Sequence, residues 1–366
     1  MQHKTIQILL LSIALLSACM HNKQTEGDIE PVDLLKVEEP PLSFFFKAVD
    51  LIQLEGKDSA YLNASCLSSY FFAEDKLYVM DQANKSVVVF NSDGSWEETI
   101  RRYGRGPQEY VMMTDMAFNA ALRSIDILEA TGAIISYSLD PPHPMIRRFK
   151  MPRVLRGINH FIPYGTGYYL FSGYEEAFLH FLDTESGELT EILGIPDVER
   201  NLRAGYATTG SPFYLFKGQV YYVDGASGSI FELEGGHARP YLGWDYGSYQ
   251  FRPENVNTQR TGGSYEELLK ASSSMAGPVT LTRETDRYVF TNVLFLRRWL
   301  NVVFDKETGK KTVFVKMKEG VIFSPGCYFD NAIYTLIPPE VVGQFLSSDI
   351  QTPKDNSNYL IIRYSL

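Results

Sequence analysis

Between residues 66 and 103, short runs of apolar residues in partial alternation with polar ones are separated by turn-forming residues. The runs lie at 67–73, 76–81, 86–90 and 96–103. Alternation with a period of two residues is typical of β-strands. The Asn-Ser-Asp-Gly segment at 91–94 is in addition a hairpin signal. This stretch therefore predicts a meander of four antiparallel strands.

The turn between the third and fourth strands recurs along the chain. The equivalent turns lie at residues 93–94, 139–141, 183–187, 233–235 and 305–309. The steps from Asp93 to Asp140 and from Gly187 to Gly235 are 47 and 48 residues, whereas 74 residues separate Gly235 from Gly309. Four strands in a period of about 40–50 residues are typical of a β-propeller. The excess predicts an insertion at about 252–278, where Ser-Tyr-Glu-Glu at 264–267 has the capping-box spacing of a helix start.

The repeat predicts six blades. Five of them carry the turn, and the sixth has strands predicted at 321–329, 332–337 and 358–364, one short of four. The alternating segment 43–54 can supply the missing outer strand, and such a closure would remove exposed edges. The expected fold class is all-β: a six-bladed β-propeller of four-stranded antiparallel blades over residues 43–366, with a small helical insertion. A seven-bladed ring and two β-sandwich domains are alternatives that the unbroken phase of the repeat disfavours.

The composition supports many short strands and argues against one class of partner. Aromatic residues make up 13% of the 366 residues, beside 28 Gly and 18 Pro. Aromatic rings favour strands, whereas Gly and Pro favour turns. The formal net charge is −10, and binding to duplex phosphates needs a basic face. Nucleic acid is therefore not an expected partner.

The N-terminal segment has the features of a signal peptide. Lys4 supplies a positive start, and the apolar run at 6–16 is too short to span a bilayer, which takes about 20 residues. The run ends in Leu-Ser-Ala-Cys at 16–19, which resembles the processing box of bacterial lipoproteins. That resemblance implies removal of residues 1–18 and lipidation of Cys19. A buried core helix is the alternative interpretation.

Further expectations concern the residues after the processing site. Met20 stands where inner-membrane lipoproteins have Asp, so the resemblance implies an outer-membrane lipoprotein with the membrane as a partner through its lipid. Residues 19–42 contain six acidic residues, two Lys and three Pro, a composition typical of extended, solvated chain. We expect a flexible acidic tether there. Its acidic residues are scattered, so periplasmic and surface-exposed display both stay open.

The chain as a whole resembles the six-bladed β-propeller lipoproteins of Bacteroidota-type bacteria, which are related in fold to TolB-like and NHL-repeat propellers. The segments that carry this resemblance are the box at Cys19 and residues 87–94, 104–110 and 358–364. The resemblance covers nearly the whole mature chain. It is specific for fold and hardly specific for function, because most members of the group have no assigned activity.

Two cysteines remain after the processing site, Cys66 and Cys327, and the repeat places them in neighbouring blades. If Leu77 and Ile333 occupy equivalent positions, Cys327 lies opposite Phe71, which is five residues from Cys66. Five residues span about 16 Å along a strand, whereas a disulfide needs Cα atoms within about 7 Å. Two buried free thiols are favoured over a disulfide.

The strand count places all additions to the repeat on one face. In a four-stranded blade, the connections between strands two and three lie on the same side as the blade-to-blade loops; we call this side the loop face. The segments 104–110, 252–278 and 338–357 all fall there. Because binding residues concentrate on loops that a rigid scaffold positions, we expect a ligand or partner to bind on this face.

Arginines gather at the starts of the blades on the loop face. They are Arg102, Arg105, Arg153, Arg156, Arg200 and Arg203, with Arg260 in the insertion. Guanidinium groups pair well with carboxylates, so an anionic glycan or an acidic peptide is a plausible ligand. The ligand-binding candidates taken from these loops are Arg102, Arg105, Glu109, Tyr110, Arg156, Arg203 and Arg260. The alternative is that the arginines bind loop carbonyls and nearby Glu side chains, as Arg105 could bind Glu109.

Two further candidates lie in or near strands. Trp244 belongs to the aromatic run at 241–251, whose rings could stack on sugars if they are exposed; their alternating spacing also fits packing between blades. His160 lies near the start of an inner strand and could face the central channel. A single His is more often a packed residue than a metal ligand, so we expect no metal and no cofactor.

Catalytic signatures are largely absent. The sequence has no G-x-S-x-G, H-E-x-x-H or P-loop motif and no cysteine pair with zinc spacing. The favoured hypothesis is a lipid-anchored envelope propeller that binds a carbohydrate, a peptide or an envelope protein without catalysis. One alternative is a propeller lyase, hydrolase or lactonase with a divalent metal in the channel, for which Asp115 and His160 are candidate groups. Another is a scaffold within an outer-membrane complex.

Overall fold

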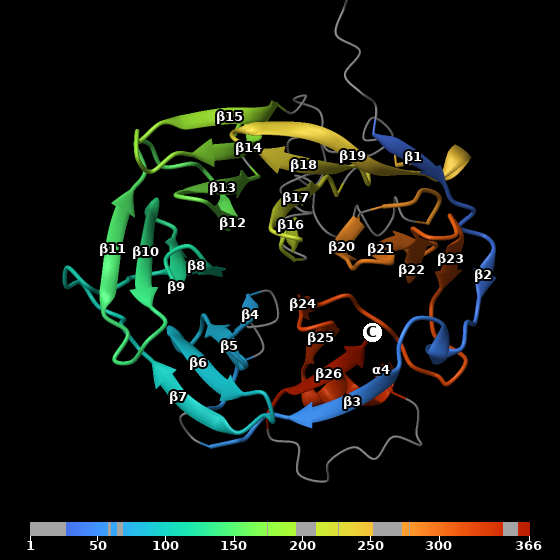
Figure 1. Cartoon of the computed structure of the whole chain (residues 1–366), viewed down its shortest axis with the longest axis horizontal. Helices are drawn as coiled ribbons and strands as arrows, with labels where there is room; N and C mark the ends of the chain where they lie inside the picture. Colours follow the sequence, from blue (N-terminus) through green and yellow to red (C-terminus); the bar gives the residue numbers. More distant parts are fainter. Residues whose placement is uncertain are drawn as a thin grey trace, which may run out of the picture.

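Six antiparallel sheets are arranged in a ring around a common axis (Figure 1). The structure is a computed structural model, and it describes residues 27–57, 60–63, 69–173, 175–194, 210–225, 227–251, 273–277, 279–346 and 358–366. Each sheet contains a four-stranded blade whose first strand is nearest the axis (Figure 1). The prediction of a six-bladed propeller of four-stranded blades is confirmed.

The first three blades are simple meanders. Blade 1 contains β4 (Tyr70–Ala73), β5 (Lys76–Asp81), β6 (Ser86–Asn91) and β7 (Trp96–Ile100). Blade 2 contains β8 (Met113–Asn119), β9 (Ser124–Glu129), β10 (Ala133–Ser138) and β11 (Met145–Lys150). Blade 3 contains β12 (Ile158–Tyr164), β13 (Gly167–Ser172), β14 (Ala177–Leu182) and β15 (Leu189–Gly194).

The N-terminal part of the chain adds strands to the other three blades: an outer fourth strand in blade 6, and an extra edge strand, described below, in each of blades 4 and 5. Blade 4 contains β16 (Phe213–Phe216), β17 (Gln219–Val223), β18 (Ile230–Glu234) and β19 (His237–Asp245). Blade 5 contains β20 (Val279–Glu284), β21 (Tyr288–Phe295), β22 (Arg298–Asp305) and β23 (Lys311–Phe314). Blade 6 contains β24 (Cys327–Phe329), β25 (Ala332–Ile337), β26 (Leu360–Ser365) and β3 (Ala48–Gln53).

The ring is closed by the strand that the sequence predicts. Strand β3 pairs antiparallel with β26, in a register that runs from Ala48 opposite Ser365 to Gln53 opposite Leu360. At the end of β3 the chain passes Gly94, whose carbonyl oxygen accepts a hydrogen bond of 2.8 Å from the Glu55 N–H. A Cβ atom on Gly94 would collide with the Gln53 carbonyl. Glycine is therefore required where the closing strand crosses this turn.

Two short strands lie outside blades 4 and 5. Strand β1 (Asp28–Pro31) pairs in parallel with β19, and β2 (Val37–Glu38) pairs in parallel with β23 (Figure 1). We call residues 28–42 the N-terminal strap. The prediction of a flexible tether up to residue 42 is therefore wrong from residue 28 onward.

The strap is held by both apolar and charged contacts. Val32 and Leu34 are buried in the hydrophobic core that blades 4 and 5 share. Among the acidic side chains, Glu30 forms an ion pair with Lys311, and Glu39 lies 3.5 Å from the ammonium group of Lys316. The acidic side chains that suggest a solvated tether thus lie beside lysines in and just after the last strand of blade 5.

Aromatic side chains fill the space between blades, as the repeat predicts. Between blades 5 and 6, the rings of Phe290 and Phe323 have centroids 5.1 Å apart, and those of Phe323 and Tyr364 are 4.9 Å apart. All three side chains are buried. The abundance of aromatic residues is therefore accounted for in large part by blade packing.

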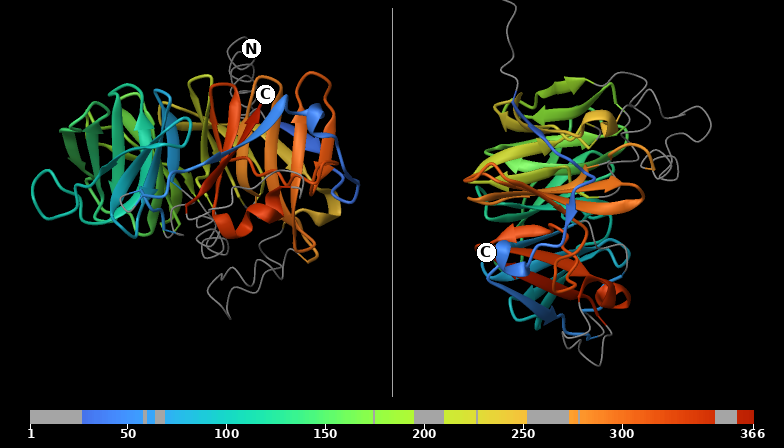
Figure 2. Two further views of the ribbon diagram at one scale, coloured as in Figure 1. Left: turned by 90° about the horizontal axis from the view of Figure 1, so that it is seen from below. Right: turned by 90° about the vertical axis from the view of Figure 1, so that its right-hand side faces the viewer.

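Helices are short in the part of the chain that the structure describes. The 3-10 segments are η1 (Leu42–Phe44), η3 (Gly247–Tyr249) and η5 (Pro339–Val341), and the α-helix is α4 (Val342–Phe345). None of the helices described is long and apolar enough to cross a membrane. Most of the helical insertion predicted at 252–278 lies outside the described residues. Figure 2 (left) places α4 and the connection between β7 and β8 on the same side of the ring, the loop face.

Candidate functional site

A cavity of about 260 Å³ occupies the centre of the ring, and we call it the channel cavity. It is lined by residues of the first strand of every blade: β4, β8, β12, β16, β20 and β24. Its walls are rich in aromatic side chains from five of the six blades, among them Phe71, Phe118, Phe161, Phe213 and Tyr328. Its charged side chains are Asp115 and Arg283. The centre of the ring therefore combines apolar walls with two charges of opposite sign.

Asp115 lies near the loop-face end of β8 and is 3% exposed. Its Oδ1 accepts hydrogen bonds from the Ser69 hydroxyl at 2.5 Å and the Met116 N–H at 2.9 Å. Its Oδ2 accepts one from the Phe161 N–H at 3.2 Å and lies 3.3 Å from Nδ1 of His160. Because these partners come from blades 1, 2 and 3, the carboxylate ties three blades together at the channel.

The enzyme hypothesis requires several metal-binding or acid–base groups to meet in the channel. Asp115 and His160 do meet, which the sequence alone could not establish. Among the described residues, however, no group of three or more His, Cys, Asp or Glu side chains is placed to hold a metal ion. Both oxygens of Asp115 are engaged with protein donors. This pair is arranged as a connection between blades.

Arg283 brings a positive charge into the channel cavity from β20. Its Nε donates a hydrogen bond to the Gly326 carbonyl oxygen, and its Nη1 donates one to the Thr282 carbonyl oxygen at 2.6 Å. Both acceptors are neutral. Within the described part of the chain, Arg283 forms no ion pair with a carboxylate. Burial lowers the pKa of Arg283 from its ordinary value.

The surroundings of Arg283 are apolar enough to affect other groups. Burial raises the pKa of the Cys327 thiol, with Arg283 opposing that shift, and it raises the pKa of Tyr70 to about 12. The Tyr70 hydroxyl donates to the Tyr334 carbonyl oxygen at 3.1 Å. Cys327 is a free thiol. Cys66, which the repeat places in the neighbouring blade, lies outside the described residues.

The next residue along β20, Glu284, does not neutralise Arg283. Successive side chains of a strand point to opposite faces. The Glu284 carboxylate is buried and accepts hydrogen bonds from the Tyr241 hydroxyl at 2.7 Å, the Lys306 ammonium group at 2.9 Å and the Tyr214 hydroxyl at 3.0 Å. Its charge is thus engaged at the junction of blades 4 and 5.

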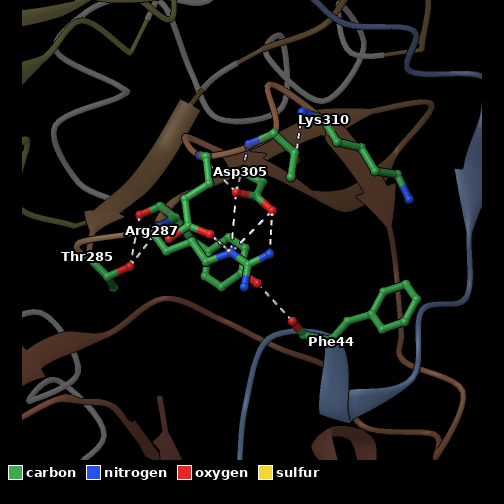
Figure 3. A network of polar contacts seen from close by, with 8 residues as sticks. Phe44, Thr285, Arg287, Asp305 and Lys310 are labelled. Atoms are coloured by element: carbon green, nitrogen blue, oxygen red, sulfur yellow. Dashed lines mark hydrogen bonds and ion pairs between the residues drawn. The ribbon is translucent and has the colours of Figure 1, made fainter.

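Arg287, another arginine of blade 5, differs from Arg283 in that carboxylates neutralise its guanidinium group (Figure 3). Its Nη2 lies 2.9 Å from Oδ2 of Asp305, and its Nε lies 3.4 Å from Glu307. The same network reaches the N-terminal part of the chain, because the Tyr288 hydroxyl donates to the Phe44 carbonyl oxygen at 2.9 Å. Among the described residues, the partners of Arg283, four residues earlier, are two carbonyl oxygens.

Two of the arginines predicted at the blade starts, Arg102 and Arg153, have side-chain partners within the protein. The Arg102 guanidinium donates to the Pro142 carbonyl oxygen. Arg153 pairs with Glu175 at 2.8 Å and with Glu191 at 3.0 Å. The alternative, in which these side chains bind loop carbonyls and nearby Glu, describes both residues. The candidates Arg203 and Arg260, like Cys19, lie outside the described residues.

At the remaining loop candidates, the hydrogen bonds that the structure gives are between main-chain N–H groups and Glu side chains. Glu109 accepts a hydrogen bond of 2.7 Å from the Gly106 N–H, in place of the expected contact with Arg105, which is exposed. A Cβ atom on Gly104 would collide with this carboxylate. The motif at 104–110 therefore stabilises its own loop. The backbone N–H of Arg156 donates to Glu175, so this candidate's main chain is fixed as well.

Tyr110 and Trp244 belong to the core and do not present accessible rings. Tyr110 is fully buried, and its hydroxyl donates to the Lys85 carbonyl oxygen at 2.8 Å. Trp244 is 3% exposed and packs edge-on against Phe304 between blades 4 and 5. The aromatic run that contains Trp244 thus alternates because it packs. Of the predicted candidates, His160 is the one that lies beside the channel cavity, through Asp115.

Arg283 is not among the predicted candidates, because most of those lie in loops and Arg283 lies in a strand. A signal was present: Leu281 and Arg283 are two residues apart in an inner strand, so they share a face, and both line the cavity. On an inner strand, a charged residue that shares a face with a cavity-lining apolar residue indicates a side chain directed at the channel.

Comparison with known proteins supports the fold. The family described as a domain of unknown function, DUF4934, matches residues 29–362. A Bacteroides fragilis protein to which export has been attributed is similar in structure, with a TM-score of 0.70 at 14% identity over 93% of this chain and 99% of that one. A member of the DUF4221 family from Bacteroides vulgatus has a TM-score of 0.57 at 11% identity over 87% and 96%. No curated protein matches the sequence.

Proposed function

The chain belongs to the DUF4934 family, and we propose that it is a non-catalytic binding protein of the bacterial cell envelope. The similar Bacteroides fragilis protein, to which export has been attributed, supports an envelope location. The lipoprotein box supports an outer-membrane anchor at Cys19, on the periplasmic or the outer surface. We also propose, from the sequence motifs, a relationship to TolB-like and NHL-repeat propellers.

The observation that carries the binding function is the channel cavity. All six inner strands converge on it, its walls are aromatic, and it contains a guanidinium group without a carboxylate partner among the described residues. Concave, mostly apolar sites with few polar groups are typical of ligand binding. We propose that a carbohydrate or a peptide inserts a side group into this cavity from the loop face.

Arrays of glycans and peptides, probed with the purified full-length chain, test this proposal. A ligand should be retained by the wild-type protein and lost when Ser211→Trp fills the cavity, because Ser211 lines it next to the start of β16. Ser43→Trp is the matched control, since Ser43 is exposed outside the ring. Equal binding by Ser211→Trp and the wild type would place the site elsewhere and overturn the proposal.

One observation favours a second candidate function. The meeting of Asp115 with His160 is what a propeller lyase, hydrolase or lactonase would need as a minimum. Turnover of an array ligand, abolished by Asp115→Asn in a protein that remains folded, would support this enzyme in place of the binding protein. Capture of an envelope protein that binds Ser211→Trp as well as wild type would instead support a scaffold.

A further inference from the structure

Among the described residues, no carboxylate pairs with the guanidinium group of Arg283 in the channel cavity. A guanidinium group carries five N–H donors, and Arg283 uses two of them on the carbonyl oxygens of Gly326 and Thr282. No further partner of Arg283 is present within the described residues. Removal of a charge from water is costly unless an opposite charge accompanies it. An anion inside the cavity would supply that charge.

From this geometry we infer that Arg283 binds the carboxylate of a small, single-ring organic acid in the channel cavity. The inference rests on the proposed function and specifies the ligand class of that site. The remaining N–H groups of Arg283 suit a carboxylate, because a planar guanidinium donates two parallel hydrogen bonds to its two oxygens.

The charges of the lining select a monoanion. Arg283 is the only Lys or Arg side chain among the described residues that line the cavity, so the lining offers one positive charge to a ligand, and the negative charge of Asp115 at the loop-face end disfavours a second negative charge on that ligand. A dianion such as a phosphate monoester would leave a surplus negative charge in an apolar space. Asp115 itself faces its protein donors, Ser69 and Phe161, and is not free to bind a cation.

The walls and the size select the body of the ligand. Phe118 of blade 2 and Tyr328 of blade 6 line the cavity, and both rings are partly exposed. Such rings stack on aromatic ligands and also on the C–H faces of sugars. The volume of about 260 Å³ lies below the 300–1,000 Å³ that is common for drug-sized ligands. One ring therefore fits better than an oligosaccharide.

Calorimetric titration of the purified full-length chain tests the inference with two probe pairs. Benzoate and its neutral analogue benzamide represent an aromatic acid, and galacturonate and galactose represent a sugar acid. In at least one pair, the acid should bind at least about tenfold more tightly than its neutral analogue. The pair that shows this difference identifies the aromatic or the sugar source of the carboxylate.

Variants of Arg283 and Arg287 test which guanidinium group binds the acid. Arg283→Met should weaken binding of the acid about tenfold or more, whereas Arg287→Met should leave it unchanged, because Arg287 is paired with Asp305 outside the cavity. Arg283→Lys keeps the charge and should retain part of the affinity. Thermal unfolding of each variant shows whether it is folded, and the comparison of acid with neutral analogue needs no variant at all.

Several results would overturn the inference. They are equal affinity for acid and neutral analogue in both pairs, no binding of either acid at millimolar concentration, and wild-type affinity in Arg283→Met. If an array ligand is blocked by Ser211→Trp while Arg283→Met binds it normally, the monocarboxylate assignment fails and the proposed binding function stands. If Ser211→Trp blocks nothing, the proposed function itself fails.

Discussion

Nδ1 of His160 lies 3.3 Å from Oδ2 of Asp115, and both side chains are buried where blades 2 and 3 meet the channel. In an active site, such a pair would need an open position for substrate or metal. Here the carboxylate also accepts hydrogen bonds from Ser69 and from the Phe161 N–H, which belong to the blades on either side of β8. The arrangement therefore joins neighbouring blades beside the channel cavity.

The buried carboxylate of Asp115 is predicted to stabilise the folded ring. Asp115→Asn should lower the free energy of unfolding by about 2–4 kcal/mol, because the amide replaces one acceptor oxygen by a donor that faces buried donors. Denaturant unfolding measures this change. Asp50→Asn, on the exposed face of β3, is the control and should be close to wild type. Wild-type stability of Asp115→Asn would contradict the structural role of this carboxylate.

His180 predicts a pH dependence of stability. It is fully buried in β14, and neither ring nitrogen has a hydrogen-bond partner among the residues that the structure describes. Burial lowers its pKa from 6.5 to about 4; Arg153 lowers it further, and Glu175 opposes the shift. Between these values the unfolded chain binds the proton and the folded protein does not, so stability falls as the pH falls through this window.

The size of this effect can be measured by unfolding at two pH values. From about pH 7 to about pH 5, His180 should account for a loss of about 2 kcal/mol in the free energy of unfolding. His180→Phe should remove that share of the loss. His237→Phe, at an exposed position, should not change it. An identical loss in the wild type and His180→Phe would show that His180 is not the titrating group.

The strap offers a matched pair of neighbouring leucines. Leu34 is 2% exposed and packs in the shared core of blades 4 and 5, whereas Leu35 is 58% exposed. Leu34→Ala should lower the free energy of unfolding by about 2–5 kcal/mol and speed protease cleavage within 28–42. Leu35→Ala should stay within about 0.5 kcal/mol of wild type. Equal cleavage rates for the two variants would mean that the strap is not docked.

The lipid anchor is tested at Cys19. Cys19→Ser should move the protein from the membrane fraction of a bacterial cell to the soluble fraction, because a multiply acylated cysteine holds a protein durably at a bilayer. Mass spectrometry of the wild-type N-terminus should find acyl chains on Cys19. A wild-type protein without acyl chains, or a Cys19→Ser protein that stays in the membrane fraction, would contradict lipidation.

The parts of the fold that could be predicted from the sequence are those that local residues specify. All five predicted turns separate a third strand from a fourth strand, as for β6 and β7 or for β22 and β23. Each turn depends on a few adjacent residues, such as Gly94 with its φ of +89°. The recurring turns identify five of the six blades, and the sixth follows from the strands predicted at 321–364.

The strap and the cavity depend on distant partners, which composition does not reveal. Asp28 pairs with Leu242, and Glu30 with Lys311, across more than half of the chain. The placement of Arg283 beside Gly326 likewise requires blades 5 and 6 to be neighbours in the closed ring. Blade-start arginines were visible in the sequence, but their carbonyl and Glu partners were not.

The docked strap also limits how far the ring can stand from a bilayer. If Cys19 carries the lipid, nine residues lead to Asp28, the first residue paired with β19, and they reach about 30 Å at most. Release of the strap as far as Ala48, the first residue of β3, would extend that reach to about 100 Å. With a lipid on Cys19, blades 4 and 5 would be held within the shorter distance of the bilayer, and contacts such as those of Leu34 would maintain it.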